Sequence, residues 1–155
     1  MRKKISVYRF NKSVSSIYLS RIRRTVNTRI LSGIEAHFIQ LTKKVGVKVF
    51  YSKQAAFSSF EKQKTANEAR IGPMVISSKI ARFGIEMNRN IEIKWGYLTQ
   101  VVDTNLKRIR YWSTQMGSLE RAMDDLGFKC CDLHEWNLGV IGRKLVCIDF
   151  GDEST

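Results

Sequence analysis

Four polar residues near the end of the chain have the types and the spacing that a metal-dependent reaction needs. They are Asp132, His134, Asn137 and Asp149. Carboxylate and amide oxygens are the hard ligands that Mg²⁺ prefers. Phosphoryl transfer from ATP requires such ligands on the metal and a carboxylate near the hydroxyl group that accepts the phosphate. This set therefore suits a Mg²⁺-dependent reaction, of which phosphoryl transfer from ATP is one.

A short hairpin is expected between Asn137 and Asp149. The apolar runs 138–141 and 144–148 flank Gly142 and Arg143, which suit a two-residue turn between antiparallel strands. A polar turn beside a hairpin could contain these residue types by chance, and for Asp132 alone chance is the favoured interpretation. The ordered set gains weight because the strand and turn context of a site accompanies it.

In order and separation, this segment resembles the protein-kinase-like superfamily. Members carry an Asp, an Asn five residues later, a short hairpin and then Asp-Phe-Gly. This chain has Asp132, Asn137 and the run Asp149-Phe150-Gly151. With His134 two residues after the Asp, it is most similar to the atypical branch of aminoglycoside phosphotransferases, lipopolysaccharide-core kinases and RIO-type kinases. Its small size resembles that of bacteriophage kinase-like chains.

The resemblance implies a role for each of these residues, with ATP and Mg²⁺ as cofactors. Asn137 and Asp149 would bind Mg²⁺, and Asp132 would orient or deprotonate the acceptor hydroxyl. His134 would steady the loop or contact the γ-phosphate.

The resemblance also implies a lysine on the third strand, held by a carboxylate from the following helix. Lys48 has this place and would contact the α- and β-phosphates. Glu61 and Glu68 both lie on a suitable face of the expected helix. Glu61 is preferred because its distance from the break at Gly72-Pro73 resembles the family's spacing. A lone lysine on a strand is more often an exposed edge charge, so Lys48 gains its meaning from the series.

Two further nucleotide contacts follow from the resemblance. Gly33 would belong to the loop that covers the nucleotide, where glycines let backbone N–H groups approach the phosphates. The family's loop usually has several glycines, and only Gly33 remains here. Leu98, in the run 97–100, would lie at the hinge whose backbone reads adenine. An ordinary strand end is the competing interpretation of this run.

Alternating and helical hydrophobic patterns predict an α+β chain. Strands are expected as a meander over 29–34, 36–41 and 45–51, and then over 76–83 and 91–102. A helix capped by Ser52 or Ser58 would run towards Ala69, and a helical region over 105–126 would have Ser118 as an internal cap and end at Gly127. With the resemblance, this gives a kinase-like fold with an antiparallel N-lobe sheet plus a helix, and a strongly truncated C-lobe ending at the Asp-Phe-Gly turn.

The charge of the chain is large and uneven. The formal net charge is +13 over 155 residues, and residues 1–34 contain no acid. We expect a basic arm over 1–28 and one kinase-like domain over 29–155. No apolar run is long enough to span a bilayer, no signal peptide is expected, and the three cysteines are expected to be reduced. A cytoplasmic protein is expected, in the host cytoplasm if it is viral.

Three functions remain open from the sequence. The first is a minimal active kinase with a protein or small-molecule acceptor. The second is a pseudokinase-type binding protein, favoured by the single loop glycine and by the absence of an activation segment after Gly151. The third is a nucleic-acid-binding protein, based on the basic arm with Tyr8, Phe10 and Tyr18 interleaved. Through this arm, nucleic acid or an acidic protein would be the partner.

Overall fold

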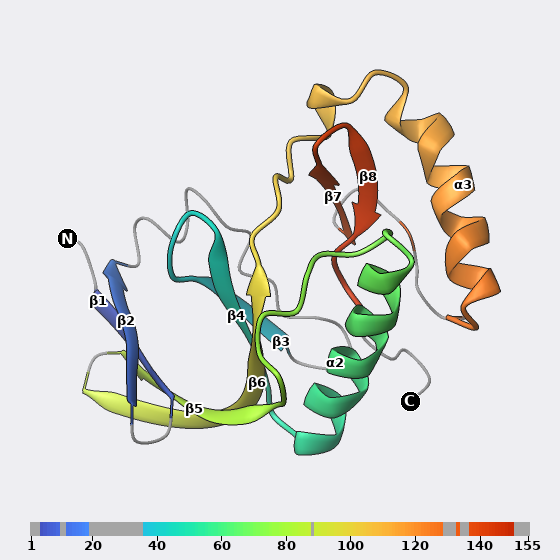
Figure 1. Cartoon of the computed structure of the whole chain (residues 1–155). Coiled ribbons are helices and arrows are strands. Elements are labelled where there is room, and N and C mark those ends of the chain that lie inside the picture. Colours follow the sequence, from blue (N-terminus) through green and yellow to red (C-terminus); the bar gives the residue numbers. More distant parts are fainter. Residues whose placement is uncertain are drawn as a thin grey trace.

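A six-stranded antiparallel sheet is the largest element of the computed structural model, which describes residues 4–9, 12–18, 36–87, 89–128, 133 and 137–150 (Figure 1). The strand order is β2-β1-β5-β6-β4-β3. The strands are β1 (Lys4–Arg9), β2 (Lys12–Tyr18), β3 (Ala36–Gln40), β4 (Val45–Phe50), β5 (Ala81–Met87) and β6 (Asn90–Gln100). With the helices described below, this confirms the α+β class.

The N-terminal segment is part of this sheet. β1 pairs with β2 on one side and with β5 on the other. Residues 4–9 and 12–18, expected within a basic arm, thus extend the sheet beyond β5. The expected strand over 29–34 lies outside the described residues, as do Phe10 and the rest of 19–35.

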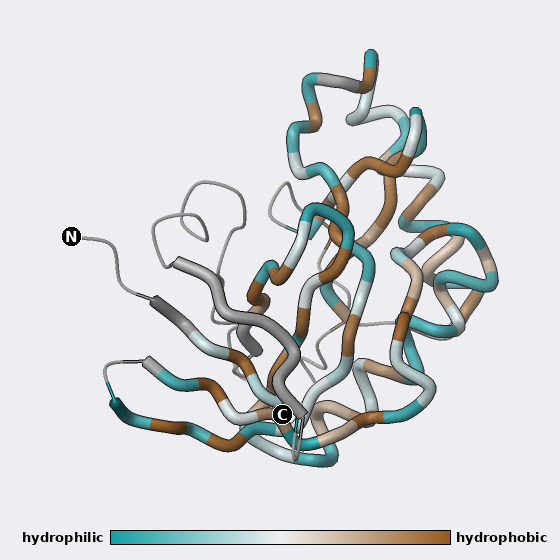
Figure 2. Tube along the Cα trace, turned by 60° about the vertical axis from the view of Figure 1, so that its left-hand side comes forward, coloured by the Kyte–Doolittle hydropathy of each residue, from teal (hydrophilic) through white to brown (hydrophobic). Residues whose placement is uncertain are grey.

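The sheet bends strongly, and its inner face holds one of the hydrophobic clusters. Figure 1 shows the bend from β4 through β6 and β5 to the β1–β2 hairpin. Apolar and polar positions alternate along these strands (Figure 2). The cluster joins residues from strands that are not neighbours in the sheet: Val7, Ile39, Leu41, Val47, Val49 and Phe83. The bend therefore brings β1 towards β3 and β4 across this cluster.

Helix α2 (Lys53–Glu68) packs on the opposite face of the sheet. The residue before it, Ser52, is the cap, because its side chain accepts a 3.0 Å hydrogen bond from the backbone N–H of Ala55. Phe60 meets the Tyr97 ring edge-on, with ring centroids 5.5 Å apart. Because side chains alternate along β4, Val47 and Val49 face the inner cluster while Lys48 faces α2.

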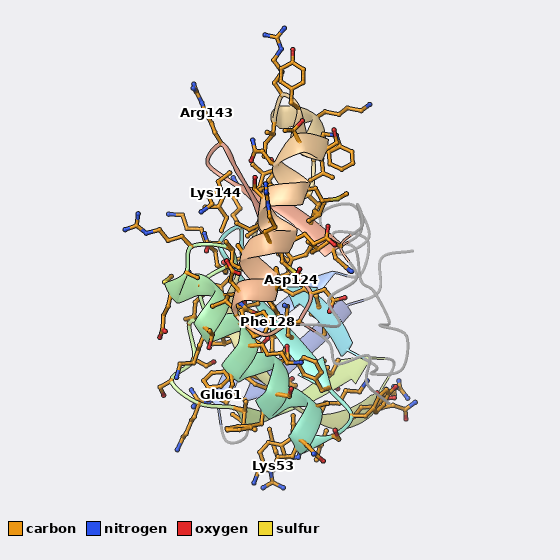
Figure 3. All side chains as sticks on the ribbon, turned by 90° about the vertical axis from the view of Figure 1, so that its right-hand side faces the viewer. Lys53, Glu61, Asp124, Phe128, Arg143 and Lys144 are labelled. Atoms are coloured by element: carbon orange, nitrogen blue, oxygen red, sulfur yellow. The ribbon has the colours of Figure 1, made fainter. Side chains whose placement is uncertain are left out.

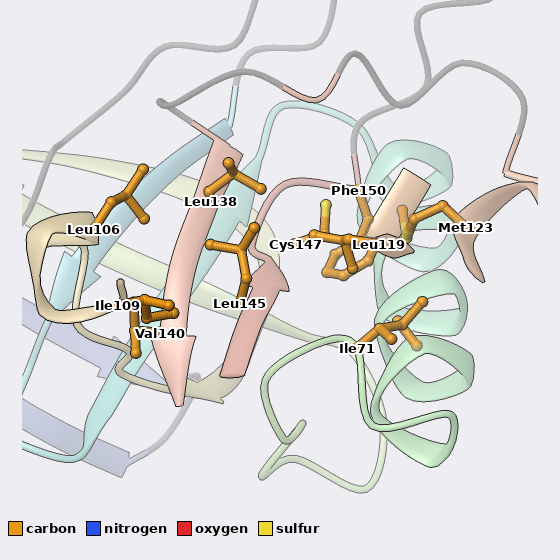
Figure 4. Close-up of a cluster of buried hydrophobic side chains, with 11 residues drawn as sticks. Ile71, Leu106, Ile109, Leu119, Met123, Leu138, Val140, Leu145, Cys147 and Phe150 are labelled. Carbon is orange, nitrogen blue, oxygen red and sulfur yellow. The ribbon is translucent and has the colours of Figure 1, made fainter. Parts of the chain in front are cut away.

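A second layer contains helix α3 (Trp112–Asp125), the 3₁₀ turn η1 (Leu106–Arg108) and the hairpin of β7 (Leu138–Ile141) and β8 (Lys144–Cys147). Figure 4 shows its core, to which Leu119 and Met123 of α3 and Leu145 of β8 contribute. Phe150 also lies in this core, where it joins the second layer to Ala66 of α2. No helix in the described ranges is long and apolar enough to cross a membrane.

The local predictions for these elements have mixed outcomes. The hairpin is confirmed, with Gly142 at φ +63° in its turn. Gly127, at φ +80°, follows the end of α3 as expected. The internal cap at Ser118 is wrong, because Ser118 lies inside α3 and the break falls earlier, between η1 and Trp112. β5 begins at Ala81 instead of 76.

Candidate functional site

Lys48, on β4, contacts both α2, the next element along the chain, and the segment 148–150, which is far away in the sequence. Its Nζ atom donates a 3.0 Å hydrogen bond to Gln63 Oε1 on α2. It also donates a 2.5 Å bond to the backbone oxygen of Ile148, which follows β8 and lies 100 residues away. The same nitrogen lies 5.4 Å from the centroid of the Phe150 ring. The strand lysine and the segment 148–150, both selected from the sequence, therefore lie side by side.

The surroundings of Lys48 change its proton affinity. Burial of the ammonium group lowers the pKa of Lys48 from 10.5 to about 8, and the nearby charges of Asp149 and Cys147 partly oppose this shift. The side chain as a whole keeps some exposure to solvent. At pH 7 the ammonium form still predominates, so Lys48 presents a positive charge inside the protein.

Gln63 is the residue of α2 that reaches Lys48. It is fully buried, and its amide has four hydrogen-bond partners. The oxygen accepts from Lys48 Nζ and, at 2.8 Å, from the Tyr97 hydroxyl. The nitrogen donates to the backbone oxygen of Pro73 at 3.2 Å and to Thr99 Oγ1 at 2.6 Å. All the hydrogen-bonding capacity of the amide is thus used inside the protein.

Glu61 does not occupy the place beside Lys48 that we expected. It is exposed, on the outer side of α2 (Figure 3), and the alternative, Glu68, is exposed as well. The reason is helical geometry. At 3.6 residues per turn, Glu61 points about 160° and Glu68 about 140° away from Gln63.

The C-terminal hairpin brings Asn137 next to the segment that contains Asp149. The backbone N–H of Ile148 donates a 2.8 Å hydrogen bond to the backbone oxygen of Asn137. Asn137 is buried, and Asp149 is partly buried. The backbone oxygen of Asp149 accepts from the thiol of Cys147, which is buried. The two expected magnesium ligands are therefore neighbours in space.

Few side chains among the described residues could act together as metal ligands. These residues contain no group of three His, Cys, Asp or Glu side chains that could hold a metal ion. Mg²⁺ usually keeps several waters and uses one or two protein ligands together with phosphate oxygens. Asn137 and Asp149 fit a site of that kind, in which a nucleotide completes the coordination, and they do not fit a site built from protein ligands alone.

Leu98 lies inside β6, and its backbone groups are already used. Its N–H donates to Ser77 Oγ at 2.7 Å, and its carbonyl accepts from the N–H of Ile76 at 2.9 Å. An adenine base would have to displace Ile76 and Ser77 to reach the backbone N–H or carbonyl of Leu98. Gly33, Asp132 and His134, and also Cys130 and Cys131, lie outside the described residues.

Gln63 is the site residue that the sequence reasoning missed. A signal for it existed, because Ala56, Ser59, Phe60, Gln63 and Ala66 form the buried stripe of α2. A glutamine in such a stripe needs buried polar partners. The choice between Glu61 and Glu68 was based on the family's spacing, which does not take the buried stripe of α2 into account.

Comparison with known proteins adds no assignment: no protein-family model, no curated protein and no solved structure matches this chain.

Proposed function

We propose that the protein is an ATP- and Mg²⁺-dependent phosphotransferase of the protein-kinase-like type, which transfers the γ-phosphate to a hydroxyl group. The observation that supports this most is the contact of Lys48 with the backbone of Ile148, directly before Asp149. The resemblance pairs the strand lysine with the Asp-Phe-Gly segment, and the two lie about 100 residues apart in the sequence. Their meeting across 100 residues is expected if they serve one site and is not required by either motif alone.

The order of elements around Lys48 also favours a kinase-like fold. Lys48 lies on β4, the strand that directly precedes α2, and the helix packs on the face of the sheet that carries the lysine. Phe150 is buried against Ala66 near the end of this helix. An antiparallel sheet with one helix, followed by a helical segment and a terminal hairpin, is the arrangement that the resemblance implies.

The residues present would have distinct tasks. Lys48 would donate hydrogen bonds to phosphate oxygens and counter their charge. Asn137 and Asp149 would hold Mg²⁺, which when bound supplies positive charge to the phosphate oxygens. Asp132 would orient the acceptor hydroxyl, and the buried Phe150 would keep water from the inner side of Asp149.

The acceptor would be a protein or a small molecule that carries a hydroxyl group. The net charge of +13 would favour an acidic acceptor or an acidic partner surface. By this proposal the protein acts in the cytoplasm.

One observation favours the alternative, a pseudokinase-type binding protein that acts through its basic surface on a host protein or nucleic acid. The residue of α2 at Lys48 is an amide and not the carboxylate that the resemblance implies. If Lys48 is fully held by the protein, it contributes to the scaffold and need not contact a phosphate.

The test is calorimetric titration with ATP, with and without Mg²⁺, followed by a γ-phosphate transfer assay on the same samples. Wild type, Lys48→Met and Asp149→Asn are compared, with Lys144→Met as the control because Lys144 is an exposed lysine of β8. We expect Mg²⁺-dependent binding that is lost in the first two variants and kept in the control. Absence of binding at every Mg²⁺ concentration would refute the proposal. Binding without transfer to any acceptor, including the protein itself, would favour the alternative.

A further inference from the structure

We propose that Gln63 is the positioning residue of the site, and that its amide oxygen directs the Lys48 ammonium towards the segment 148–150 without adding a negative charge. This inference rests on the proposed function for its consequence in nucleotide binding. Its structural part concerns the hydrogen bond between two side chains and can be measured in the protein alone.

The orientation of the Gln63 amide is determined by its partners. The Lys48 ammonium can only donate hydrogen bonds, and the Pro73 carbonyl can only accept them. The amide oxygen must therefore face Lys48 and the amide nitrogen must face Pro73. A flipped amide would place two donors against each other at one end and two acceptors at the other.

The rest of the network holds this orientation. The Tyr97 hydroxyl donates to Gln63 Oε1, so its own oxygen is left to accept from Ser59 Oγ, 2.8 Å away. Thr99 Oγ1 accepts from Gln63 Nε2. Ser59, Gln63 and Thr99 are buried, which makes the loss of any of these bonds costly. Gln63 is thus a fixed acceptor and not an adaptable one.

A neutral acceptor has a consequence that a carboxylate would not have. Asp149 and Cys147 act electrostatically on Lys48, while α2 presents the neutral amide of Gln63 and β6 presents the Tyr97 hydroxyl. Because α2 contributes no charge at this point, the positive charge of Lys48 remains available to Asp149 and to an incoming phosphate. The hydrogen bond from Gln63 on α2 then determines the position of the ammonium, and the segment 148–150 supplies the groups with which the ammonium pairs.

The direct test observes the Lys48 ammonium by ¹H–¹⁵N NMR, where a hydrogen-bonded, enclosed ammonium gives a signal that exposed lysines lose by exchange. Lys48→Met assigns the signal. Gln63→Met removes the amide with little change in volume, and Gln63→Glu restores an oxygen acceptor. Ser59→Ala is the matched control, because it alters the same network on the side away from Lys48. The Kd of Mg-ATP is measured on each sample.

We expect Gln63→Met to lose or shift the ammonium signal and to weaken Mg-ATP binding about tenfold, the effect of one charge-assisted hydrogen bond. Gln63→Glu should recover the signal, and Ser59→Ala should leave signal and affinity within about twofold. An unchanged signal in Gln63→Met would overturn the inference, because Gln63 would then only fill space. If Gln63→Met does not fold, Gln63→Glu takes its place, because a carboxylate oxygen at this position must shift the signal of an ammonium that it contacts. With it, an unchanged ammonium signal overturns the inference and a shifted one supports it. If wild type binds no Mg-ATP, the proposed function fails, and the NMR signal still decides the role of Gln63.

Discussion

Replacing Lys48 with methionine should change how the stability of the protein depends on pH. The pKa of Lys48 is about 8 in the folded protein and 10.5 in the unfolded chain. The unfolded chain therefore holds the proton more tightly than the folded protein does. Folding at pH 7 consequently carries a free-energy cost, because the lysine stays protonated in a state that binds the proton less tightly. The cost is fully present below pH 8 and is relieved as the pH rises from 8 to 10.5.

The size of the effect follows from the two pKa values. From these pKa values, the free energy of unfolding of wild type should rise by about 2 kcal/mol more than that of Lys48→Met between pH 7 and pH 9.5. Because the Lys48 side chain keeps some exposure, solvent screening reduces this to about 1–2 kcal/mol. The hydrogen bonds lost with the ammonium change the absolute stability, but they contribute little to the slope with pH. Asp149, Cys147 and Tyr97 are present in both proteins.

The assay is urea unfolding of wild type and Lys48→Met at pH 7 and pH 9.5, with Lys144→Met as the exposed control. For each protein, the free energy of unfolding at pH 7 is subtracted from that at pH 9.5. We expect this change to be more positive for wild type than for Lys48→Met, and to be the same in the control as in wild type. Equal pH dependence in wild type and Lys48→Met would refute the reasoning, because the Lys48 ammonium would then be hydrated in the folded state.

Three further changes test the packing around the site by urea unfolding. In Gly96→Ala the new Cβ would lie too close to the backbone oxygen of Lys48, so we expect the free energy of unfolding to fall by about 3 kcal/mol or more. Gly117→Ala in α3 is the control, because nothing lies within 4 Å of its new Cβ, and its free energy of unfolding should rise by about 0.5–1 kcal/mol. Ser52→Ala removes the cap of α2 and should cost about 1 kcal/mol, while Ser52→Asp should retain most of the stability. Tyr97→Phe removes the hydroxyl that Gln63 and Ser59 share and should cost about 1–2 kcal/mol. A stable Gly96→Ala protein, an unaffected Ser52→Ala or an unaffected Tyr97→Phe would contradict the respective contact.

The elements that could be predicted from the sequence are those set by local chemistry. The β7–β8 hairpin follows from Gly142 in a turn between two apolar runs. The start of α2 follows from the side-chain oxygen of Ser52, although Ser58 was an equal candidate until the structure chose between them. In both cases the deciding interactions lie within a few residues of each other.

What could not be predicted depends on contacts between distant residues. The pairing of β1 with β5 joins segments more than 70 residues apart, and no local pattern specifies it. Residues 76–80 were expected in a strand, but Ile76 and Ser77 bond to Leu98 from a segment that contains only an isolated bridge. The choice of Glu61 failed for the same reason, because the side of α2 that meets Lys48 is determined by how the whole helix packs.

The state of Lys48 bears on the choice between an active site and a scaffold. A scaffold role is served better by an aliphatic side chain, because an enclosed ammonium costs desolvation and Gln63 can be satisfied by Tyr97 and its own donors. A phosphate beside Lys48 would reverse this cost, since an anion raises the pKa of the lysine back towards its ordinary value. The same lysine is thus unfavourable for folding alone and favourable once an anion is bound. Under the proposed function, a bound anion would therefore offset the desolvation cost of Lys48, whether or not the phosphate is then transferred.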